Sequence, residues 1–279
     1  MKFADLHLHT VFSDGTYTPE ELILESEKIG LSAISVVDHD TIEGIEPALE
    51  IAKAKKIEVL TGIELTAEYE GLEIHMLGYL IDYKSNPLRE KLDFLKKIRI
   101  ERIYKILAKL KDMAVTLRAE SVFDLAKKGT VGRLHIARAM VKEGLVSSIR
   151  EAFQKYIGDK CPAFILGFRL TPCEAIKLIR EAGGIPVLAH PYSINRDDLI
   201  PNFVDDGLMG LEVYYPEHSQ SMINFYLSLT KKYNLLVTGG SDCHGQAKPE
   251  VKIGSVKIPY ELVEKLKAAK ANMFKTDIR

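Results

Sequence analysis

The sequence has little of several features that mark particular classes of protein. Its three cysteines, Cys161, Cys173 and Cys243, are an odd number without CxxC spacing, which argues against a disulfide framework and a thiolate zinc site. No apolar run approaches the roughly 20 residues that a membrane span needs, and the first residues lack the apolar stretch of a signal peptide. We therefore expect a cytoplasmic protein with no membrane partner.

The chain also lacks fixed-period repeats, low-complexity tracts and the ladder of aromatic and basic residues on which single-strand nucleic-acid binders stack bases. Long nucleic acid is therefore not an expected partner. The 279 residues, of which 46% are apolar, suit a single barrel or one domain with an insertion.

Charge is distributed unevenly along the chain. The formal net charge is only −1, but residues 84–133 hold 14 Lys or Arg against 6 Asp or Glu, which leaves −9 for the remainder. A basic element beside an acidic body suits an anionic substrate. A lysine-rich helix face in solvent would give the same composition, so both interpretations stay open.

Short β-rich runs alternate with helical runs outside the middle of the chain, as in βαβ units. Thr18-Pro19-Glu20-Glu21 and Thr171-Pro172-Cys173-Glu174 are capping boxes that begin two helices, and Glu70-Gly71 indicates a hairpin turn. The expected core strands lie at residues 3–7, 33–37, 59–64, 72–80, 185–189, 210–214 and 235–239. The pattern therefore predicts an α/β fold with seven core strands.

The middle of the chain shows helical spacing alone. Apolar residues recur at intervals of three or four, and the expected helices lie at residues 87–111, 121–128, 134–143 and 149–157. We therefore expect a barrel built from residues 1–83 and 162–279, interrupted by an all-helical insertion at residues 84–161.

Imidazoles and carboxylates gather near the ends of the short apolar runs. The nine candidates are His7, His9, Asp14, His39, Glu64, His75, His190, Asp242 and His244. Any one of these histidines alone would usually be an ordinary core or surface residue. In a closed barrel, however, the carboxyl ends of the strands share one rim, so the set predicts a centre for two or three divalent ions of manganese, zinc or iron.

Local spacing gives two further expectations for this rim. Residues two apart in an extended chain face the same side, so His7 with His9, and Asp242 with His244, are each placed to bind one ion while Leu8 faces away. We expect Gly239-Gly240 to turn the chain sharply before the last of these pairs.

These motifs resemble those of the polymerase and histidinol phosphatase (PHP) family of metal-dependent phosphoesterases. The resemblance rests on His7-Leu8-His9, Ser13-Asp14-Gly15, Asp38-His39, Glu64, His75 with Leu77-Gly78-Tyr79, Ala189-His190-Pro191 and Ser241-Asp242-Cys243-His244. It implies a distorted seven-stranded (β/α)7 barrel. It also implies three ion sites, formed by His7, His9, Glu64 and Asp242, by Glu64, His75 and His190, and by Asp14, His39 and His244. Asp14 stands where several members carry histidine, which would weaken the third site or favour manganese.

The insertion resembles that of members which hydrolyse 3′,5′-nucleoside bisphosphates, some of which also trim short 5′-phosphorylated RNA. The similar segments are residues 132–139 and 152–158. In that group the insertion covers the barrel mouth, and an arginine and a histidine contact substrate phosphate; the matching residues here are Arg133 and His135. A guanidinium offers phosphate two parallel donors. Without the resemblance, a surface salt bridge and a buried helix residue would be the simpler interpretations.

The resemblance implies a phosphatase acting on a small phosphorylated nucleotide. The expected reaction removes the 3′-phosphate of a nucleoside 3′,5′-bisphosphate by attack of a metal-bound hydroxide; the residue that protonates the leaving oxygen is not assigned. The alternatives are 5′-3′ cleavage of short oligoribonucleotides, hydrolysis of histidinol phosphate, and a non-catalytic metal-binding scaffold. The cationic substrate of the second alternative gains little from a basic insertion.

Overall fold

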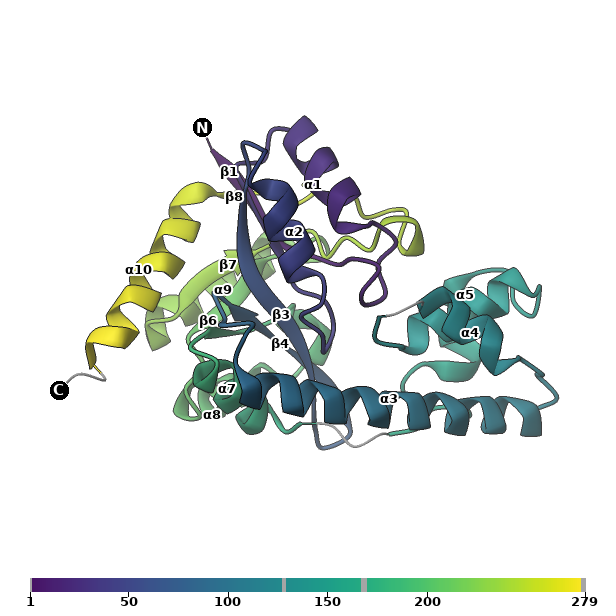
Figure 1. The fold of residues 1–279 in the computed structure, drawn as a ribbon. Coiled ribbons are helices and arrows are strands. Elements are labelled where there is room, and N and C mark those ends of the chain that lie inside the picture. Colours follow the sequence, from purple (N-terminus) through teal and green to yellow (C-terminus); the bar gives the residue numbers. More distant parts are fainter. Residues whose placement is uncertain (1, 127–128, 167–169, 277–279) are drawn as a thin grey trace.

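The computed structural model describes residues 2–126, 129–166 and 170–276, and its centre is a sheet that curls toward a barrel (Figure 1). The strands are β1 (Phe3–Leu8), β2 (Ala33–Val36), β3 (Glu58–Tyr69), β4 (Leu72–Tyr79), β5 (Ile185–Leu188), β6 (Gly210–Tyr214), β7 (Leu236–Gly239) and β8 (Ile258–Pro259). Their order across the sheet is β7-β6-β5-β4-β3-β2-β1-β8. A parallel bridge joins Leu8 to Cys243, so the segment that follows β7 lies beside β1 and nearly closes the barrel.

The α/β barrel predicted from the sequence is confirmed, with a small difference in strand number. The eighth strand has only two residues and pairs antiparallel with β1, and so short a segment has no periodicity from which it could be predicted. Strand β4 runs antiparallel to both β3 and β5, whereas the other neighbours in the barrel run parallel. This reversal is the main departure from a regular barrel.

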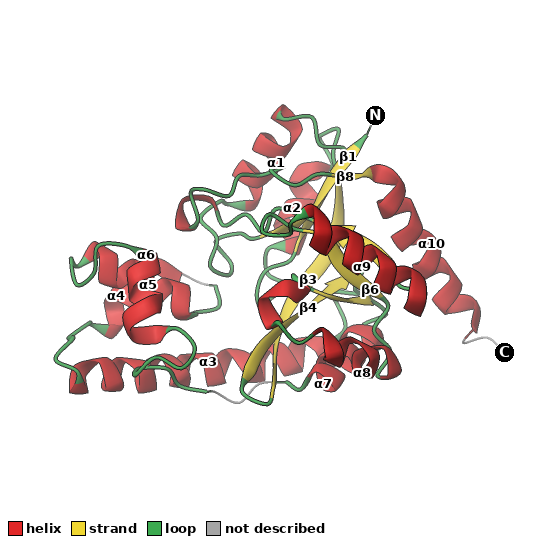
Figure 2. Cartoon of the chain, turned by 180° about the vertical axis from the view of Figure 1, so that it is seen from behind, coloured by secondary structure: helices red, strands yellow, loops and turns green. Residues whose placement is uncertain are grey.

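Helices cover the outside of the sheet (Figure 2). They are α1 (Pro19–Lys28), α2 (Ile45–Ala52), α7 (Pro172–Glu181), α8 (Ile200–Asp205), α9 (Gln220–Tyr233) and α10 (Tyr260–Thr276). Both predicted capping boxes form: the hydroxyls of Thr18 and Thr171 accept the backbone N–H of Glu21 and Glu174, each at 3.2 Å. No helix in the described part of the chain is both long and apolar enough to cross a bilayer. The cytoplasmic location stays a prediction.

The insertion consists of α3 (Asn86–Asp112), α4 (Ala119–Ala126), α5 (Arg133–Lys142), α6 (Ile149–Ala152) and the π-helix η1 (Phe153–Ile157). Leu88, Leu92 and Leu95 of α3 pack into the barrel-side core, whereas Ile103 and Ile106 pack into a second cluster with the other helices of the insertion. Helix α3 therefore extends from the barrel to the second cluster, which lies apart from the barrel (Figure 1). Lys127 and Lys128, at the end of one expected helix, lie outside the described residues.

The end of β7 approaches β1 closely at Gly240. A Cβ at this position would overlap the backbone nitrogen of His7 and lie 2.8 Å from an oxygen of Asp5. Neither Gly239 nor Gly240 has a positive φ; that conformation belongs to Asp242, with φ 54°. The predicted sharp turn at the glycines is therefore wrong, and the missing side chain of Gly240 instead allows the two strand ends to meet.

We expect Gly240→Ala to destabilise the fold by about 1–3 kcal/mol, because the backbone of β1 must move to make room for the methyl group. Urea unfolding followed by circular dichroism measures this free energy. Gly144→Asn is the control, since nothing lies within 4 Å of a Cβ there and asparagine tolerates a positive φ. Unfolding of both variants at the wild-type urea concentration would contradict the close approach.

Candidate metal centre

Glu64, in the middle of β3, is the centre of the cluster that the sequence predicts. Its Oε2 lies 3.4 Å from His7 Nε2, 3.3 Å from His9 Nε2 and 3.2 Å from His39 Nδ1. Its Oε1 lies 3.0 Å from His75 Nδ1 and 3.2 Å from His190 Nε2. One fully buried carboxylate thus faces five imidazoles from four different parts of the chain.

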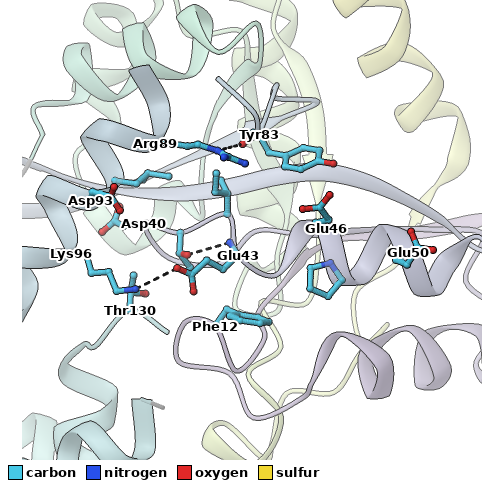
Figure 3. Close-up of a pocket in the computed structure, with 14 residues that line it drawn as sticks. Phe12, Asp40, Glu43, Glu46, Glu50, Tyr83, Arg89, Asp93, Lys96 and Thr130 are labelled. Atoms are coloured by element: carbon cyan, nitrogen blue, oxygen red, sulfur yellow. Dashed lines mark hydrogen bonds and ion pairs between the residues drawn. The ribbon is translucent and has the colours of Figure 1, made fainter. Parts of the chain in front are cut away.

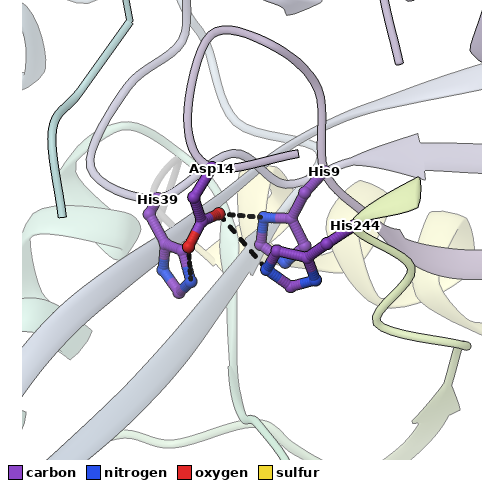
Figure 4. Close-up of side chains that lie close together, drawn as sticks. All are labelled: His9, Asp14, His39 and His244. Carbon is purple, nitrogen blue, oxygen red and sulfur yellow. Dashed lines mark ion pairs between the residues drawn. The ribbon is translucent and has the colours of Figure 1, made fainter. Parts of the chain in front are cut away.

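The remaining predicted ligands complete this cluster on one side. Asp14 Oδ1 lies 3.2 Å from His244 Nε2, and Asp14 Oδ2 lies 3.9 Å from His39 Nε2. Figure 4 shows His9, Asp14, His39 and His244 turned toward one another. The structure therefore brings all nine predicted side chains to the mouth of the barrel.

Within the described residues, the donor atoms form three overlapping groups in which every atom lies within 4.8 Å of the others. The groups are His7, His9 and Asp242; His9, Asp14, His39 and His244; and His39, Glu64 and His75. His190 adjoins the last group, with Nε2 3.3 Å from His75 Nδ1.

The expectation that Asp242 and His244 bind one ion together stays a prediction. The positive φ of Asp242 departs from the extended geometry on which that expectation depended, but Asp242 Oδ1 still lies 3.5 Å from His244 Nδ1. Asp242 Oδ1 also lies 3.3 Å from His7 and 3.1 Å from His9, and His244 Nε2 lies 3.2 Å from Asp14. Leu8 and Cys243 do pack away from the mouth, in a hydrophobic cluster.

Several atoms at this mouth are buried without a hydrogen-bond partner among the described residues. They are His7 Nε2, His9 Nε2, Asp14 Oδ1, His39 Nδ1 and Glu64 Oε2. Buried polar atoms normally have partners, and leaving them unsatisfied is costly. A mixed set of imidazole nitrogens and carboxylate oxygens is the ligand chemistry of divalent transition metals, so these residues fit bound cations.

The pKa shifts of most of these groups favour the protonation states that metal binding requires. Burial lowers the pKa of His9 and His39, which keeps their imidazoles neutral. For Glu64, burial acts to raise the pKa, but the surrounding imidazoles outweigh it and hold the pKa well below its usual value. His7 and His75 differ: burial lowers each pKa, but neighbouring carboxylates outweigh it, and they raise the pKa of His7 well above its usual value and that of His75 to about 10. A bound cation would have to displace those protons.

Side chains that the sequence did not single out hold these ligands in place. Glu212 contacts His7 Nδ1 at 2.8 Å, Glu73 contacts His75 Nε2 at 3.0 Å, and Ser193 contacts His190 Nδ1 at 2.8 Å. Such second contacts fix the orientation and tautomer of a ligating imidazole. A sequence signal existed for Glu212, because a single carboxylate in the apolar strand β6 is unusual for a buried strand.

A cleft of about 1120 Å³ opens over this mouth and separates the barrel from the insertion. Its basic lining residues are Arg99, Arg102, Arg133, Arg150 and Lys248. Its apolar wall includes Leu134, Ile149 and Phe153. The lining of the cleft therefore combines the ligand cluster with basic side chains and an apolar surface, and Lys248 donates to the predicted ligand Asp242 at 2.9 Å.

The two residues that the resemblance assigns to substrate phosphate lie differently. Arg133 lines the cleft and donates to Glu73 at 2.9 Å and Asp159 at 2.7 Å. His135 is only 1% exposed and does not line the cleft; its Nδ1 accepts the backbone N–H of Gly132 at 3.1 Å. The structure thus places Arg133 at the mouth and His135 behind it, in the first turn of α5.

A second cavity, of about 710 Å³, lies between α2 and α3 and carries mainly acidic side chains (Figure 3). Asp40, Glu43, Glu46, Glu50 and Asp93 line it, but none of the nine predicted ligands does. We therefore place the candidate site in the larger cleft.

We expect His135 to make stability depend on pH. Burial lowers its pKa to about 4, below the ordinary 6.5, so protonation favours the unfolded chain and stability is lost as the pH falls from 6.5 toward 4. His135→Leu removes this loss together with the capping bond, which only the neutral imidazole can accept. Between pH 7 and pH 4, wild-type stability should fall relative to the variant by about 3 kcal/mol. Urea unfolding in EDTA checks this, and a constant difference would contradict it.

Comparison with known proteins gives consistent relatives. The chain is 33% identical to the 5′-3′ exoribonuclease of Haemophilus influenzae, over 86% of this chain and 89% of that protein. It is 29% identical to the 3′,5′-nucleoside bisphosphate phosphatase of Chromobacterium violaceum, over 86% of each. A crystal structure from Bifidobacterium adolescentis, assigned as a metal-dependent phosphoesterase, matches with a TM-score of 0.88 and 31% identity over 94% of each chain.

The PHP domain model matches residues 5–158, a span that holds six of the nine predicted ligands and nearly all of the insertion. The relatives extend the match over most of the chain. The chain therefore belongs to the PHP family and is a metal-dependent phosphoesterase.

Proposed function

We propose that this phosphoesterase removes the 3′-phosphate of a nucleoside 3′,5′-bisphosphate. The observation that carries the proposal is the cluster of buried atoms without hydrogen-bond partners around Glu64, at the base of a cleft whose lining includes Arg99, Arg102, Arg133 and Arg150. A substrate with a phosphate at each end of a nucleoside would meet both features. The relative from Chromobacterium violaceum, a 3′,5′-nucleoside bisphosphate phosphatase, supports this choice.

Two or three divalent ions of manganese, zinc or iron would occupy the mouth. We propose His7, His9, Glu64 and Asp242 for the first, Glu64, His75 and His190 for the second, and Asp14, His39 and His244 for the third. When bound, such ions lower the pKa of a coordinated water and polarise a phosphoryl group. Glu64 would serve two sites, because its oxygens face separate sets of imidazoles.

The insertion, residues 84–161, would bind the part of the substrate that points away from the ions. Arg133 is held toward the mouth by Glu73 and offers a planar fork that matches phosphate oxygens. It begins α5, whose N-terminal dipole favours an anion. Leu134, Ile149 and Phe153 form an apolar wall on which a nucleobase can pack. His135 would not contact the substrate; it would fix the first turn of α5 through its hydrogen bond with Gly132.

Cleavage of short 5′-phosphorylated RNA from its 5′ end is the second candidate. Pockets for small ligands have volumes of roughly 300–1,000 Å³, and the cleft of about 1120 Å³ exceeds that range. The extra space suits a second nucleotide. The exoribonuclease of Haemophilus influenzae supports this candidate.

The proposal predicts that manganese-loaded protein releases phosphate from 3′-phosphoadenosine 5′-phosphate and leaves adenosine 5′-phosphate. His9→Ala, which removes a side chain shared by two of the donor groups, is the inactive control. Phosphate release no faster than this control would exclude the leading function. A 5′-phosphorylated trinucleotide assayed in parallel, with products resolved by length, would identify the second candidate.

Arg133→Lys should raise the KM for the preferred substrate about tenfold or more, because lysine keeps the charge but loses the paired hydrogen bonds to phosphate. Steady-state kinetics at saturating manganese measure this. Arg118→Lys is the matched control, since Arg118 is 76% exposed and does not line the cleft. Equal KM values for the two variants would remove Arg133 from the substrate site.

A further inference from the structure

Glu212 of β6 lies between two parts of the ligand cluster and is fully buried. One carboxylate oxygen accepts from His7 Nδ1 at 2.8 Å, and the other accepts the backbone N–H of His190 at 2.9 Å. His7 belongs to the donor group with His9 and Asp242, whereas His190 faces Glu64 and His75. A single side chain therefore touches both halves of the cluster without facing the mouth itself.

The contact with His7 sets which ring nitrogen is free. A carboxylate can only accept a hydrogen bond, so the Nδ1–H of His7 donates to Glu212. In the neutral ring the lone pair is then on Nε2, which lies at the mouth, 3.4 Å from Glu64 and 3.3 Å from Asp242. The opposite tautomer would place a hydrogen where a cation has to bind.

The contact with His190 holds a strained backbone. His190 has φ 26° and ψ 61°, a conformation that costs a non-glycine residue on the order of 1–3 kcal/mol. Glu212 accepts its N–H, and Ser193 contacts its Nδ1 at 2.8 Å. Together these contacts direct Nε2 to Glu64, 3.2 Å away.

We propose that Glu212 is a positioning residue that couples the two parts of the metal centre, because one carboxylate fixes the tautomer of His7 and the backbone of His190. This inference rests on the proposed function in one respect, namely that divalent ions occupy the cluster. A loss at Glu212 therefore weakens ion binding on both sides at once, although Glu212 is itself no ligand.

Glutamine cannot replace Glu212 in this role. Its amide has the same shape, but it offers one acceptor oxygen and one NH2 donor, while both partners require an acceptor. If the oxygen faces His190, the NH2 group forces His7 into the wrong tautomer. If the oxygen faces His7, the NH2 group opposes the N–H of His190, so one contact is lost in either orientation.

The test compares ion-free wild type, Glu212→Gln and the exposed control Glu264→Gln by calorimetric titration with manganese. We expect Glu212→Gln to bind the ions about 10–100-fold more weakly, and its cobalt-loaded form to show a changed visible absorption spectrum. The control should match wild type in both. Unchanged affinity and spectrum in a folded Glu212→Gln protein would overturn the coupling while leaving the proposed function intact.

If Glu212→Gln does not fold, Glu212→Asp carries the same test. Aspartate keeps both acceptor oxygens and the charge but is one methylene shorter, so it cannot reach both partners. We expect an affinity between those of wild type and the glutamine variant, and wild-type affinity would overturn the role. Absence of manganese or cobalt binding by wild type would overturn the proposed function together with this inference.

Discussion

The site depends on neutralising the charge of one buried carboxylate, that of Glu64. Glu64 is fully buried and faces five imidazoles, and removing ionised groups from water costs several kcal/mol each unless opposite charge compensates. Protonation of the imidazoles alone neutralises this cluster poorly, because the pKa values of His9 and His39 are lowered whereas that of His75 is raised. Divalent cations among these groups would satisfy them together, and the barrel brings the ligands close enough for that.

The distortion of the barrel has a direct consequence for this cluster. In a regular barrel every ligand would come from a carboxyl-end rim, but His75 lies in the middle of the antiparallel strand β4, paired in register with Thr66 of β3. Residues two apart on a strand share one face, so Glu64 and Thr66 point the same way as His75. The β3–β4 hairpin thus adds His75 beside Glu64 from the antiparallel side, whereas His39 reaches Glu64 through a parallel bridge.

The parts of the site that could be predicted are those encoded in short sequence motifs. His7-Leu8-His9 at a strand end, and Glu64 in an apolar run, need only local periodicity and the rule that strand ends share a rim. Gly240 could not be predicted, because its role depends on how closely β7 approaches β1. The approach of Asp242 to His7 could be expected only from the family resemblance, because local spacing contains no information on the positive φ of Asp242.

The basic residues of the insertion do more than attract anions, because some of them attach the insertion to the barrel. Arg99 of α3 pairs with Asp40 and contacts Thr66 of β3 at 2.8 Å, so part of the positive charge attaches the insertion to the barrel. Arg133 contacts one oxygen of Glu73, and His75 contacts the other at 3.0 Å. The position of the insertion and the orientation of a candidate ligand are therefore connected through one carboxylate. A group that draws Arg133 away from Glu73 would remove one of the contacts that hold the carboxylate against His75.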